Sequence, residues 1–338
     1  MHKILVTGGA GYIGSHTIVD LIQKGFEVVC IDSHINSFPQ SLDAVKDLTG
    51  ITVNHYNLDL CDLAATEKVF QTHSDIVGII HFAALKAVGE SVDKPLLYFN
   101  NNLKSQLNIL HCAEKYGVKA FIFSSSCTVY GSAKELPVTE ETPMQEAESP
   151  YGRTKQVGEY ILKDCQHSCD INTISLRYFN PAGAHTSGKM GESPKVVAMN
   201  LVPVITETAY GKREMCYVHG DDYNTRDGSC IRDYIHVMDI ADAHEKALTY
   251  LLNDHNTSKY EVFNLGIGKG VSVLEAIKAF EKTSGMKLKY NIGPRRQGDI
   301  VAMYADASKA QTVLKWSPKY DIEDIMSTAW QWEQNKKY

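Results

Sequence analysis

The sequence predicts an α/β protein: a doubly wound parallel sheet, followed by a smaller lobe of mixed α/β structure. In the first half of the chain, apolar runs rich in β-branched residues alternate with segments that repeat apolar residues at helical spacing. After about Arg177 this alternation gives way to irregular segments broken by glycine and proline. Regular alternation of strand and helix is typical of βαβ units, whose strands pair in parallel.

Six strands are expected in the first half, because each is a short apolar run bounded by polar or turn residues. They are Lys3–Thr7, Glu27–Asp32, Thr52–Tyr56, Val77–His81, Ala120–Ser124 and Asn172–Leu176. Helices are expected between them, at Gly11–Lys24, Leu63–Gln71, Pro95–Tyr116 and Tyr151–His167. In the third of these helices, Leu103, Leu107 and Leu110 are spaced for one buried face.

The second half predicts a loop-rich lobe with shorter helices. These helices are expected at Val196–Tyr210, Met238–Asn253, Val271–Ser284 and Ile322–Gln334. Val262–Leu265 has the pattern of a buried strand that returns to the first sheet. We therefore expect one domain over residues 1–180 and a second over residues 181–338, with a soft boundary because some later segments return to the first domain.

Composition and charge exclude several classes of protein. Of the 338 residues, 43% are hydrophobic and 22% are charged, as in ordinary globular domains, and the net charge is −6. A negative chain lacks the positive field of generic nucleic-acid or anionic-membrane binders. The longest apolar run, Val77–Leu85, is far shorter than a membrane span and contains His81. The first strand begins at Lys3, which leaves no room for a presequence, so a cytoplasmic location is expected.

The eight cysteines and thirteen histidines show no metal-ligand spacing. No CxxC, HxH or HExxH pattern occurs, and the chain is large enough to fold without disulfides. Cys165 and Cys169 are four residues apart on an expected helix, but two thiolates alone make a poor metal site. We expect reduced, mostly structural cysteines and no metal.

A glycine-rich turn follows the first strand. Thr7–Ser15 reads TGGAGYIGS, which places Gly8, Gly11 and Gly14 between a strand and a helix. Such glycines permit a tight turn and close approach of a pyrophosphate to the helix N-terminus, although a glycine cluster alone also fits an ordinary turn. Asp32 ends the second strand, 24 residues after Gly8. A carboxylate there accepts from both ribose hydroxyls and repels a 2′-phosphate, so the sequence predicts a Rossmann-like site that prefers NAD to NADP.

A tyrosine and a lysine occur four residues apart at the start of an expected helix. Tyr151 and Lys155 share one helix face and follow Ser126 by 25 residues or more. Tyr130 and Lys134 have the same spacing, but they precede a proline-containing loop, so Tyr130 is expected to be a packing residue. Ser126 ends a serine run at the carboxyl end of a strand, where ligands of α/β sheets bind.

This tyrosine, lysine and serine predict proton transfer coupled to hydride transfer. A phenol with a pKa near 10 is a poor base at neutral pH, but a lysine ammonium and a positive nicotinamide nearby favour the phenolate. Tyr151 would then remove a hydroxyl proton as hydride leaves the same carbon. Ser126 would hydrogen-bond the reacting oxygen. A solvated helix-surface pair is the competing interpretation.

Together these features resemble the UDP-glucose 4-epimerases, within the extended branch of the short-chain dehydrogenase/reductase superfamily. The resemblance runs from the first strand to Asp306 and is highly specific. It rests on Thr7–His16 (TGGAGYIGSH), His81–Ser91 (HFAALKAVGES), Ser124–Gly131 (SSSCTVYG), Tyr151–Lys155, Leu176–His185 (LRYFNPAGAH), Ile231–Asp239 (IRDYIHVMD) and Arg295–Asp299 (RRQGD).

The resemblance implies an isomerase that interconverts UDP-glucose and UDP-galactose through a 4-keto sugar, with NAD regenerated in each turnover. It makes Tyr151 the base and then the acid, gives Lys155 the role of lowering its pKa, and places Ser126 on the sugar O4. The cofactor residues that it implies are Gly8, Gly11, Tyr12, Ile13, Gly14, Asp32, Asn36, Ser37, Asp59, Leu60, Phe82, Ala83, Ala84, Lys86, Asn101, Ser126, Tyr151, Lys155 and Tyr178.

For the UDP-sugar, the matched positions lie mostly in the second half. They are Lys86, Ser126, Tyr151, Phe179, Asn180, Asn200, Leu201, Arg232, Arg296, Asp299 and Met303. Arginine suits a pyrophosphate, because its forked donors match two oxygens. The resemblance also implies a homodimer that pairs the helices Pro95–Tyr116 and Tyr151–His167 of two subunits, and a role in galactose metabolism.

Two positions depart from the pattern of the family. Met303 stands where members carry tyrosine or a smaller residue such as cysteine, so some tolerance of UDP-N-acetylhexosamines is expected. His219 stands where an aromatic packs on uracil. Residues 127–130 contain no carboxylate, which argues against sugar dehydration. A 4-epimerase for pentose or uronate UDP-sugars, a dehydrogenase that releases NADH, and a non-catalytic NAD-binding sensor remain alternatives.

Overall fold

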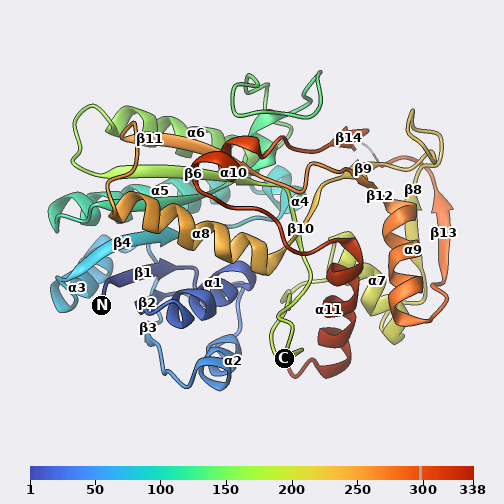
Figure 1. Cartoon of the computed structure of the whole chain (residues 1–338), viewed down its shortest axis with the longest axis horizontal. Coiled ribbons are helices and arrows are strands. Elements are labelled where there is room, and N and C mark those ends of the chain that lie inside the picture. Colours follow the sequence, from blue (N-terminus) through green and yellow to red (C-terminus); the bar gives the residue numbers. More distant parts are fainter. Residues whose placement is uncertain (297–298) are drawn as a thin grey trace.

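A parallel seven-stranded sheet is the centre of the computed structural model, which describes residues 1–296 and 299–338 (Figure 1). Every pairing within this sheet is parallel. In spatial order its strands are β11 (Tyr260–Leu265), β6 (Asn172–Tyr178), β5 (Ala120–Ser126), β4 (Ile76–His81), β1 (Lys3–Thr7), β2 (Glu27–Ile31) and β3 (Asn54–Tyr56). The order reverses between β1 and β4, which is the switch point where ligands of such sheets bind.

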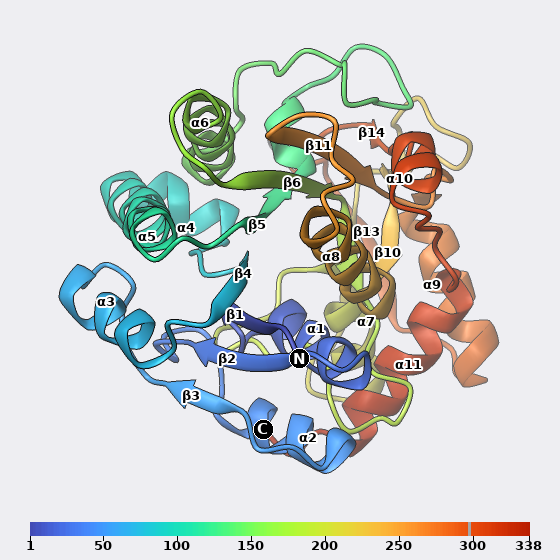
Figure 2. The same ribbon diagram turned by 60° about the vertical axis from the view of Figure 1, so that its left-hand side comes forward.

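Helices cover both faces of the sheet (Figure 2). One face packs against α1 (Tyr12–Gln23), α2 (Gln40–Thr49) and α8 (Val237–Leu252), through a core that includes Ile18, Val45 and Leu248. The other face packs against α3 (Leu63–Thr72), α5 (Pro95–Lys115) and α6 (Pro150–Cys165), through a core that includes Phe70, Ile109 and Leu162. The short helices α4 (Val88–Asp93) and α10 (Ser308–Val313) and the 3₁₀ turn η1 (Cys127–Tyr130) complete this part.

The second lobe combines helices with small sheets. α7 (Leu201–Tyr210), α9 (Val273–Ser284) and α11 (Ile322–Asn335) share a core with Ile205, Phe280 and Ile325. The strands pair as β7 (Asn180–Ala182) with β10 (Tyr234–His236), as β8 (Cys216–His219) with β13 (Tyr290–Gly293), and as β9 (Ile231–Arg232) between β12 (Val271–Ser272) and β14 (Ala302–Met303).

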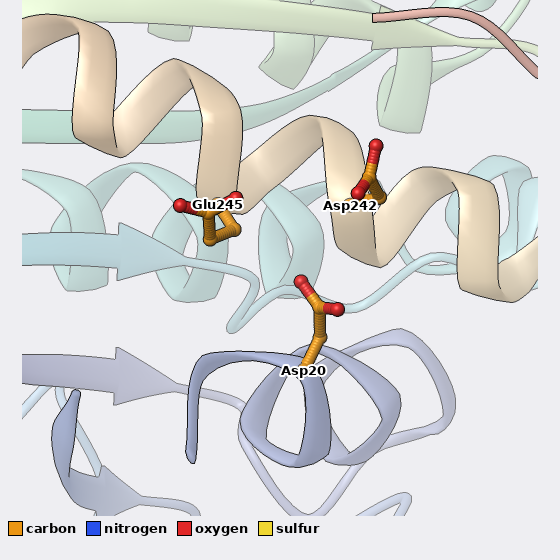
Figure 3. A group of neighbouring side chains, drawn as sticks. All are labelled: Asp20, Asp242 and Glu245. Carbon is orange, nitrogen blue, oxygen red and sulfur yellow. The ribbon is translucent and has the colours of Figure 1, made fainter. Parts of the chain in front are cut away.

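Three carboxylates and a lysine join α1 to α8. Asp20 of α1 and Asp242 and Glu245 of α8 have oxygens within 4.8 Å of one another (Figure 3). The Lys24 ammonium lies among them, at 3.1, 2.9 and 2.7 Å from the three residues in that order. A lysine therefore supplies the positive charge that this cluster needs, and it ties the first βα unit to a helix from the second half.

Most of the sequence-predicted elements are confirmed. The six first-half strands and four first-half helices agree to within two residues at each end, and the predicted return of Val262–Leu265 to the first sheet is confirmed by β11. The division at residue 180 remains a prediction. The start of one helix is wrong: α7 begins at Leu201, not Val196, because Asn200 takes an extended N-cap conformation. α2, α4, α10 and the small sheets were not predicted, and Gln297 and Gly298 of the RRQGD motif lie outside the described residues.

The predicted buried face of α5 is also wrong. Leu110 is buried, but Leu107 is 51% exposed, and the buried side chains beside Leu110 include Ser105, Gln106 and Ile109. The leucines therefore do not mark the core face of this helix. All eight cysteines are free thiols. No helix in residues 1–296 or 299–338 combines the length and apolarity needed to cross a membrane.

Candidate active site

The glycine turn joins β1 to α1 at the switch point of the sheet. Gly8 has a φ of +68°, and a Cβ on it would lie 2.7 Å from the Ala83 backbone nitrogen. A Cβ on Gly14 would lie 2.4 Å from the Gly8 carbonyl oxygen. No side chain caps the N-terminus of α1 at Gly11 in the structure as described. The first-turn amides of α1, including those of Tyr12 and Ile13, therefore have the arrangement that a pyrophosphate requires.

Asp32 lies directly after β2 and beside this turn. It is 8% exposed, and its carboxylate accepts hydrogen bonds from the Ala10 N–H at 3.0 Å and from the Ser37 hydroxyl at 2.8 Å. A pocket opens next to these residues. Its lining combines the predicted residues Gly11, Tyr12, Asn36 and Ser37 with Ala10, Ser15, Phe38, Ser41, Gly191, Ser193 and Tyr338. The uncapped helix and the adjacent carboxylate fit the adenosine and pyrophosphate of NAD.

Further predicted cofactor residues collect at the same edge of the sheet. Because the strands are parallel, their carboxyl ends meet at one edge. Gly8 follows β1, Asp32 follows β2, and Asp59 and Leu60 follow β3 by a few residues. Phe82, Ala83 and Ala84 follow β4, Ser126 ends β5 and Tyr178 ends β6, while Asn101 lies on α5.

Tyr151 and Lys155 lie in the first turns of α6, whose start is fixed by Ser149. The Ser149 hydroxyl accepts from the Gly152 N–H at 3.1 Å, as an N-cap does. Lys155 is 5% exposed, and its ammonium donates to the Ser124 carbonyl oxygen at 2.6 Å. The same Nζ lies 5.8 Å from the centre of the Tyr151 ring. The helix therefore holds the ammonium between the serine strand and the phenol.

Burial is the largest influence on the pKa of both Lys155 and Tyr151. It lowers the pKa of Lys155 to about 8. It raises the pKa of Tyr151 well above its ordinary value, and the neighbouring Ser126 hydroxyl opposes this increase. In the protein alone the phenol is thus neutral. Formation of the phenolate has to draw on the Lys155 ammonium and on positive charge brought by a bound cofactor.

The predicted arginine pair and Met303 come together on the second lobe. Met303 of β14 lies opposite Arg232 of β9 in the strand register. Asp299 Oδ1 lies 2.6 Å from Arg296 Nη2 and 3.6 Å from Arg232 Nη2. Met303 is buried in one cluster with Phe179, against which Cys127 packs. An apolar cluster of the second lobe therefore contacts the serine turn, and two guanidinium groups lie next to it around Asp299.

Lys86 and Asn200 share a partner that sequence reasoning missed. Glu192 Oε1 lies 3.4 Å from Lys86 Nζ and accepts from Asn200 Nδ2 at 3.0 Å. Asn200 precedes Leu201, the first residue of α7, and Asn180 belongs to β7. His219 is exposed at the end of β8, and its predicted contact with uracil remains a prediction.

A buried ion pair behind the serine strand was not predicted either. Glu159 of α6 and Arg177 of β6 are 1% and 5% exposed, and Arg177 Nη2 lies 2.6 Å from Glu159 Oε2. Arg177 also donates to the Tyr130 hydroxyl, which in turn donates to Asn264 Oδ1 at 2.6 Å. Tyr130 is fully buried, as expected of a packing residue. The only sequence signal for Glu159 is its position four residues after Lys155.

Comparisons with known proteins agree over nearly the full chain. A family model described as GDP-mannose 4,6 dehydratase matches residues 5–329. The UDP-glucose 4-epimerase of Bacillus subtilis is 47% identical over 334 residues, which cover 98% of this chain and 97% of that protein. UDP-glucose 4-epimerase 2 of Arabidopsis thaliana is 48% identical over 340 residues, which cover 99% of this chain and 96% of that protein.

Solved structures of related enzymes also match this chain over nearly its full length. The crystal structure of the Bifidobacterium longum UDP-glucose 4-epimerase in complex with NAD+ and UDP has a TM-score of 0.92 at 47% identity, covering 99% of this chain and 98% of that chain. The Stenotrophomonas maltophila enzyme, with bound NAD and formylated UDP-arabinopyranose, has a TM-score of 0.95 at 42% identity, covering 99% and 98%. The chain therefore belongs to the UDP-glucose 4-epimerase family, within the extended short-chain dehydrogenase/reductases.

Proposed function

We propose that this protein is an NAD-dependent UDP-glucose 4-epimerase, an isomerase that interconverts UDP-galactose and UDP-glucose through a 4-keto intermediate. The observation that carries the proposal is the placement of Tyr151 and Lys155 beside Ser126, at the sheet edge that also holds the glycine turn and Asp32. Relatives of this name match the chain from end to end.

In the proposed reaction, one set of side chains transfers the proton and another binds the nucleotide. NAD, when bound, supplies a reversible hydride acceptor. Tyr151 takes the proton of the sugar 4-hydroxyl as the C4–H bond breaks and returns it when that bond re-forms on the other face. Lys155 holds positive charge near the phenol, and Ser126 hydrogen-bonds the reacting oxygen. Arg232 and Arg296 hold the UDP pyrophosphate, far from C4, so that the keto-sugar can turn while the nucleotide stays bound.

The turn after Ser126 favours epimerisation over dehydration. Residues 127–130 form η1 and read Cys-Thr-Val-Tyr. Elimination of water next to a 4-ketone needs an acid and a base at the neighbouring carbons. This turn offers neither carboxylate nor imidazole, although the matching family model carries a dehydratase description.

Met303 motivates a wider sugar range. Its flexible side chain lies in one buried cluster with Phe179 and is smaller than a tyrosine at this position. We infer that UDP-N-acetylgalactosamine and UDP-N-acetylglucosamine are also interconverted, more slowly than the hexoses. Formation of either product at high enzyme concentration supports this inference, and its absence contradicts it.

A homodimer is the assembly that the surface supports. Apolar side chains are exposed on α5 and α6, where Leu96 is 81%, Leu107 51% and Tyr160 53% exposed. α4, α5 and α6 lie together at one side of the molecule (Figure 2). Exposed apolar side chains on neighbouring helices favour an interface there. A role in galactose metabolism is a proposal that rests on the sequence resemblance, and a cytoplasmic location is one that rests on the first strand beginning at Lys3.

Proton NMR of UDP-galactose with purified protein and no added coenzyme tests the function. We expect the anomeric signal of UDP-glucose to grow to a fixed ratio, without NADH absorbance. Accumulation of NADH would instead indicate a dehydrogenase. Lack of change even with added NAD would contradict the proposal, and pentose and uronate UDP-sugars would then separate a related epimerase from a non-catalytic NAD-binding protein.

A further inference from the structure

Glu159 continues the line of Tyr151 and Lys155 along α6. The three residues are spaced four apart and therefore share one helix face. Glu159 is 1% exposed, so its carboxylate is more deeply buried than the lysine one turn before it. A buried carboxylate is costly unless it is paired and hydrogen-bonded. The groups that pair with the Glu159 carboxylate therefore indicate which part of the site it positions.

These partners belong to the two strands that carry the site. Arg177 of β6 donates from Nε to Glu159 Oε1 at 2.9 Å and from Nη2 to Oε2 at 2.6 Å. The Ser125 hydroxyl of β5 donates to the same carboxylate. Ser125 lies between Ser124, whose carbonyl accepts from Lys155, and Ser126. Arg177 precedes Tyr178. Glu159 thus links α6 to the ends of β5 and β6 next to the predicted catalytic groups.

We propose that Glu159 is a positioning residue for the epimerisation: with Arg177 as its counter-ion, it seats Lys155 on the serine strand and keeps that lysine charged. This inference rests on the proposed function. Replacing a buried ion pair with apolar groups is often neutral or stabilising. A buried ion pair beside Lys155 is therefore weak evidence of a purely stabilising role.

Among the described residues around Lys155, Glu159 supplies the negative charge that acts on its ammonium. Burial lowers the pKa of Lys155 to about 8, and the charge of Glu159 opposes this decrease. On β4, burial lowers the pKa of His81 to about 3, so this imidazole is neutral at physiological pH. Tyr151 of α6 and Tyr178 of β6 are phenols whose pKa burial raises. Arg177 is engaged by Glu159 and Tyr130.

The test is the pH dependence of turnover in Glu159→Gln. We expect the alkaline limb of the kcat profile, where Lys155 loses its proton, to move to lower pH by about one unit. Because Glu159→Gln leaves Arg177 buried without a counter-ion, the double variant Glu159→Gln with Arg177→Gln is measured beside it. The double variant removes both buried charges. Because loss of the Arg177 charge offsets part of the loss of the Glu159 charge, the limb should shift in the same direction but by less than in Glu159→Gln.

Tyr260→Phe is the matched control. It removes the hydrogen bond from the Tyr260 hydroxyl to Glu159 Oε2, at 3.2 Å, and leaves both charges in place. A lowered thermal midpoint with an unmoved alkaline limb is expected for Tyr260→Phe. If the double variant also loses only stability, with its limb unmoved, Glu159 is a structural residue and the proposal is wrong.

A titration that does not depend on turnover separates this proposal from the proposed function. The protein is labelled at lysine Cε with ¹³C, and Lys155→Met identifies the signal of Lys155. In Glu159→Gln this signal should titrate at lower pH than in the wild-type protein. An inactive wild-type protein contradicts the epimerase proposal, whereas an unchanged Lys155 titration contradicts the role of Glu159.

Discussion

In the proposed mechanism, proton transfer depends on the phenol of Tyr151. Tyr151→Phe keeps the ring and removes the hydroxyl, so we expect kcat to fall by about 10²–10⁴-fold, the usual worth of a general acid–base group. UDP affinity should survive, because Arg232 and Arg296 lie on the other lobe. NMR measures the expected fall in turnover, and calorimetry measures the UDP affinity that should survive. Comparable kcat in variant and wild type would remove Tyr151 from the mechanism.

The buried ammonium of Lys155 gives activity and stability opposite responses to alkaline pH. Its pKa falls from 10.5 to about 8 on folding. Above pH 8 the ammonium is lost and kcat should decline. Between pH 8 and 10.5 the unfolded chain binds more protons at this residue than the folded chain, so its contribution to the free energy of unfolding rises with pH.

Lys155→Met separates these two effects. The variant should lose the alkaline limb along with most of its activity, and the pH-dependent gain in stability from this site should vanish. Urea titrations at pH 7.5 and 9.5, compared between the variant and the wild type, measure the second effect. Equal slopes of stability against pH in the two proteins would contradict the assignment.

At the scale of elements, Lys24 joins α1 to α8 through its three carboxylate partners. Lys24→Met retains the aliphatic stem and leaves Asp20, Asp242 and Glu245 facing one another. We expect a loss of about 2 kcal/mol in the free energy of unfolding, because Asp20 and Glu245 lose the ammonium that joins them to Asp242 and the carboxylates then repel one another in a half-buried site. Lys319→Met is the control, since that exposed lysine lies 3.4 Å from Asp242 at the rim. Equal effects of the two substitutions would mean that Lys24 has no special role.

A feature can be predicted from the sequence when neighbouring residues along the chain determine it. The glycine turn, Asp32 and the Tyr151–Lys155 pair have short-range signatures, and the structure gathers them at one sheet edge. The Glu159–Arg177 pair has no such signature, because its members meet only when α6 packs on β6.

The same reasoning explains the helices that were missed or misassigned. α2 was not predicted, because Ser41, Ala44 and Val45 make too small a buried face for a clear apolar period. On α5, the leucine spacing is real, but apolar periodicity does not distinguish a core from an exposed or subunit-binding surface. Leu107 fits the apolar spacing but is half exposed, so it belongs to the surface rather than to the core.

At the scale of the whole molecule, the exposed leucines of α5 provide a test of the proposed homodimer. If α5 and α6 pair across a homodimer, Leu107→Glu places a charge in the interface, and the protein should sediment as a monomer. Lys278→Glu, an exposed change on α9 of the second lobe, should leave the assembly unchanged. Sedimentation equilibrium measures both. A Leu107→Glu protein with the assembly state of the wild type would place the interface elsewhere.

The position of β11 determines when the main sheet can be completed during synthesis. This strand comes from residues 260–265, yet it pairs with Thr173–Tyr178, nearly all of β6. The helix α8 lies just before it in sequence and covers one face of the sheet. Until residue 265 has left the ribosome, β6 is an unpaired edge with exposed backbone donors and acceptors. A nascent chain that ends near residue 180 therefore holds all of the predicted cofactor residues on an unfinished and aggregation-prone scaffold. Stable retention of cofactor is therefore expected only after residue 265 has emerged from the ribosome.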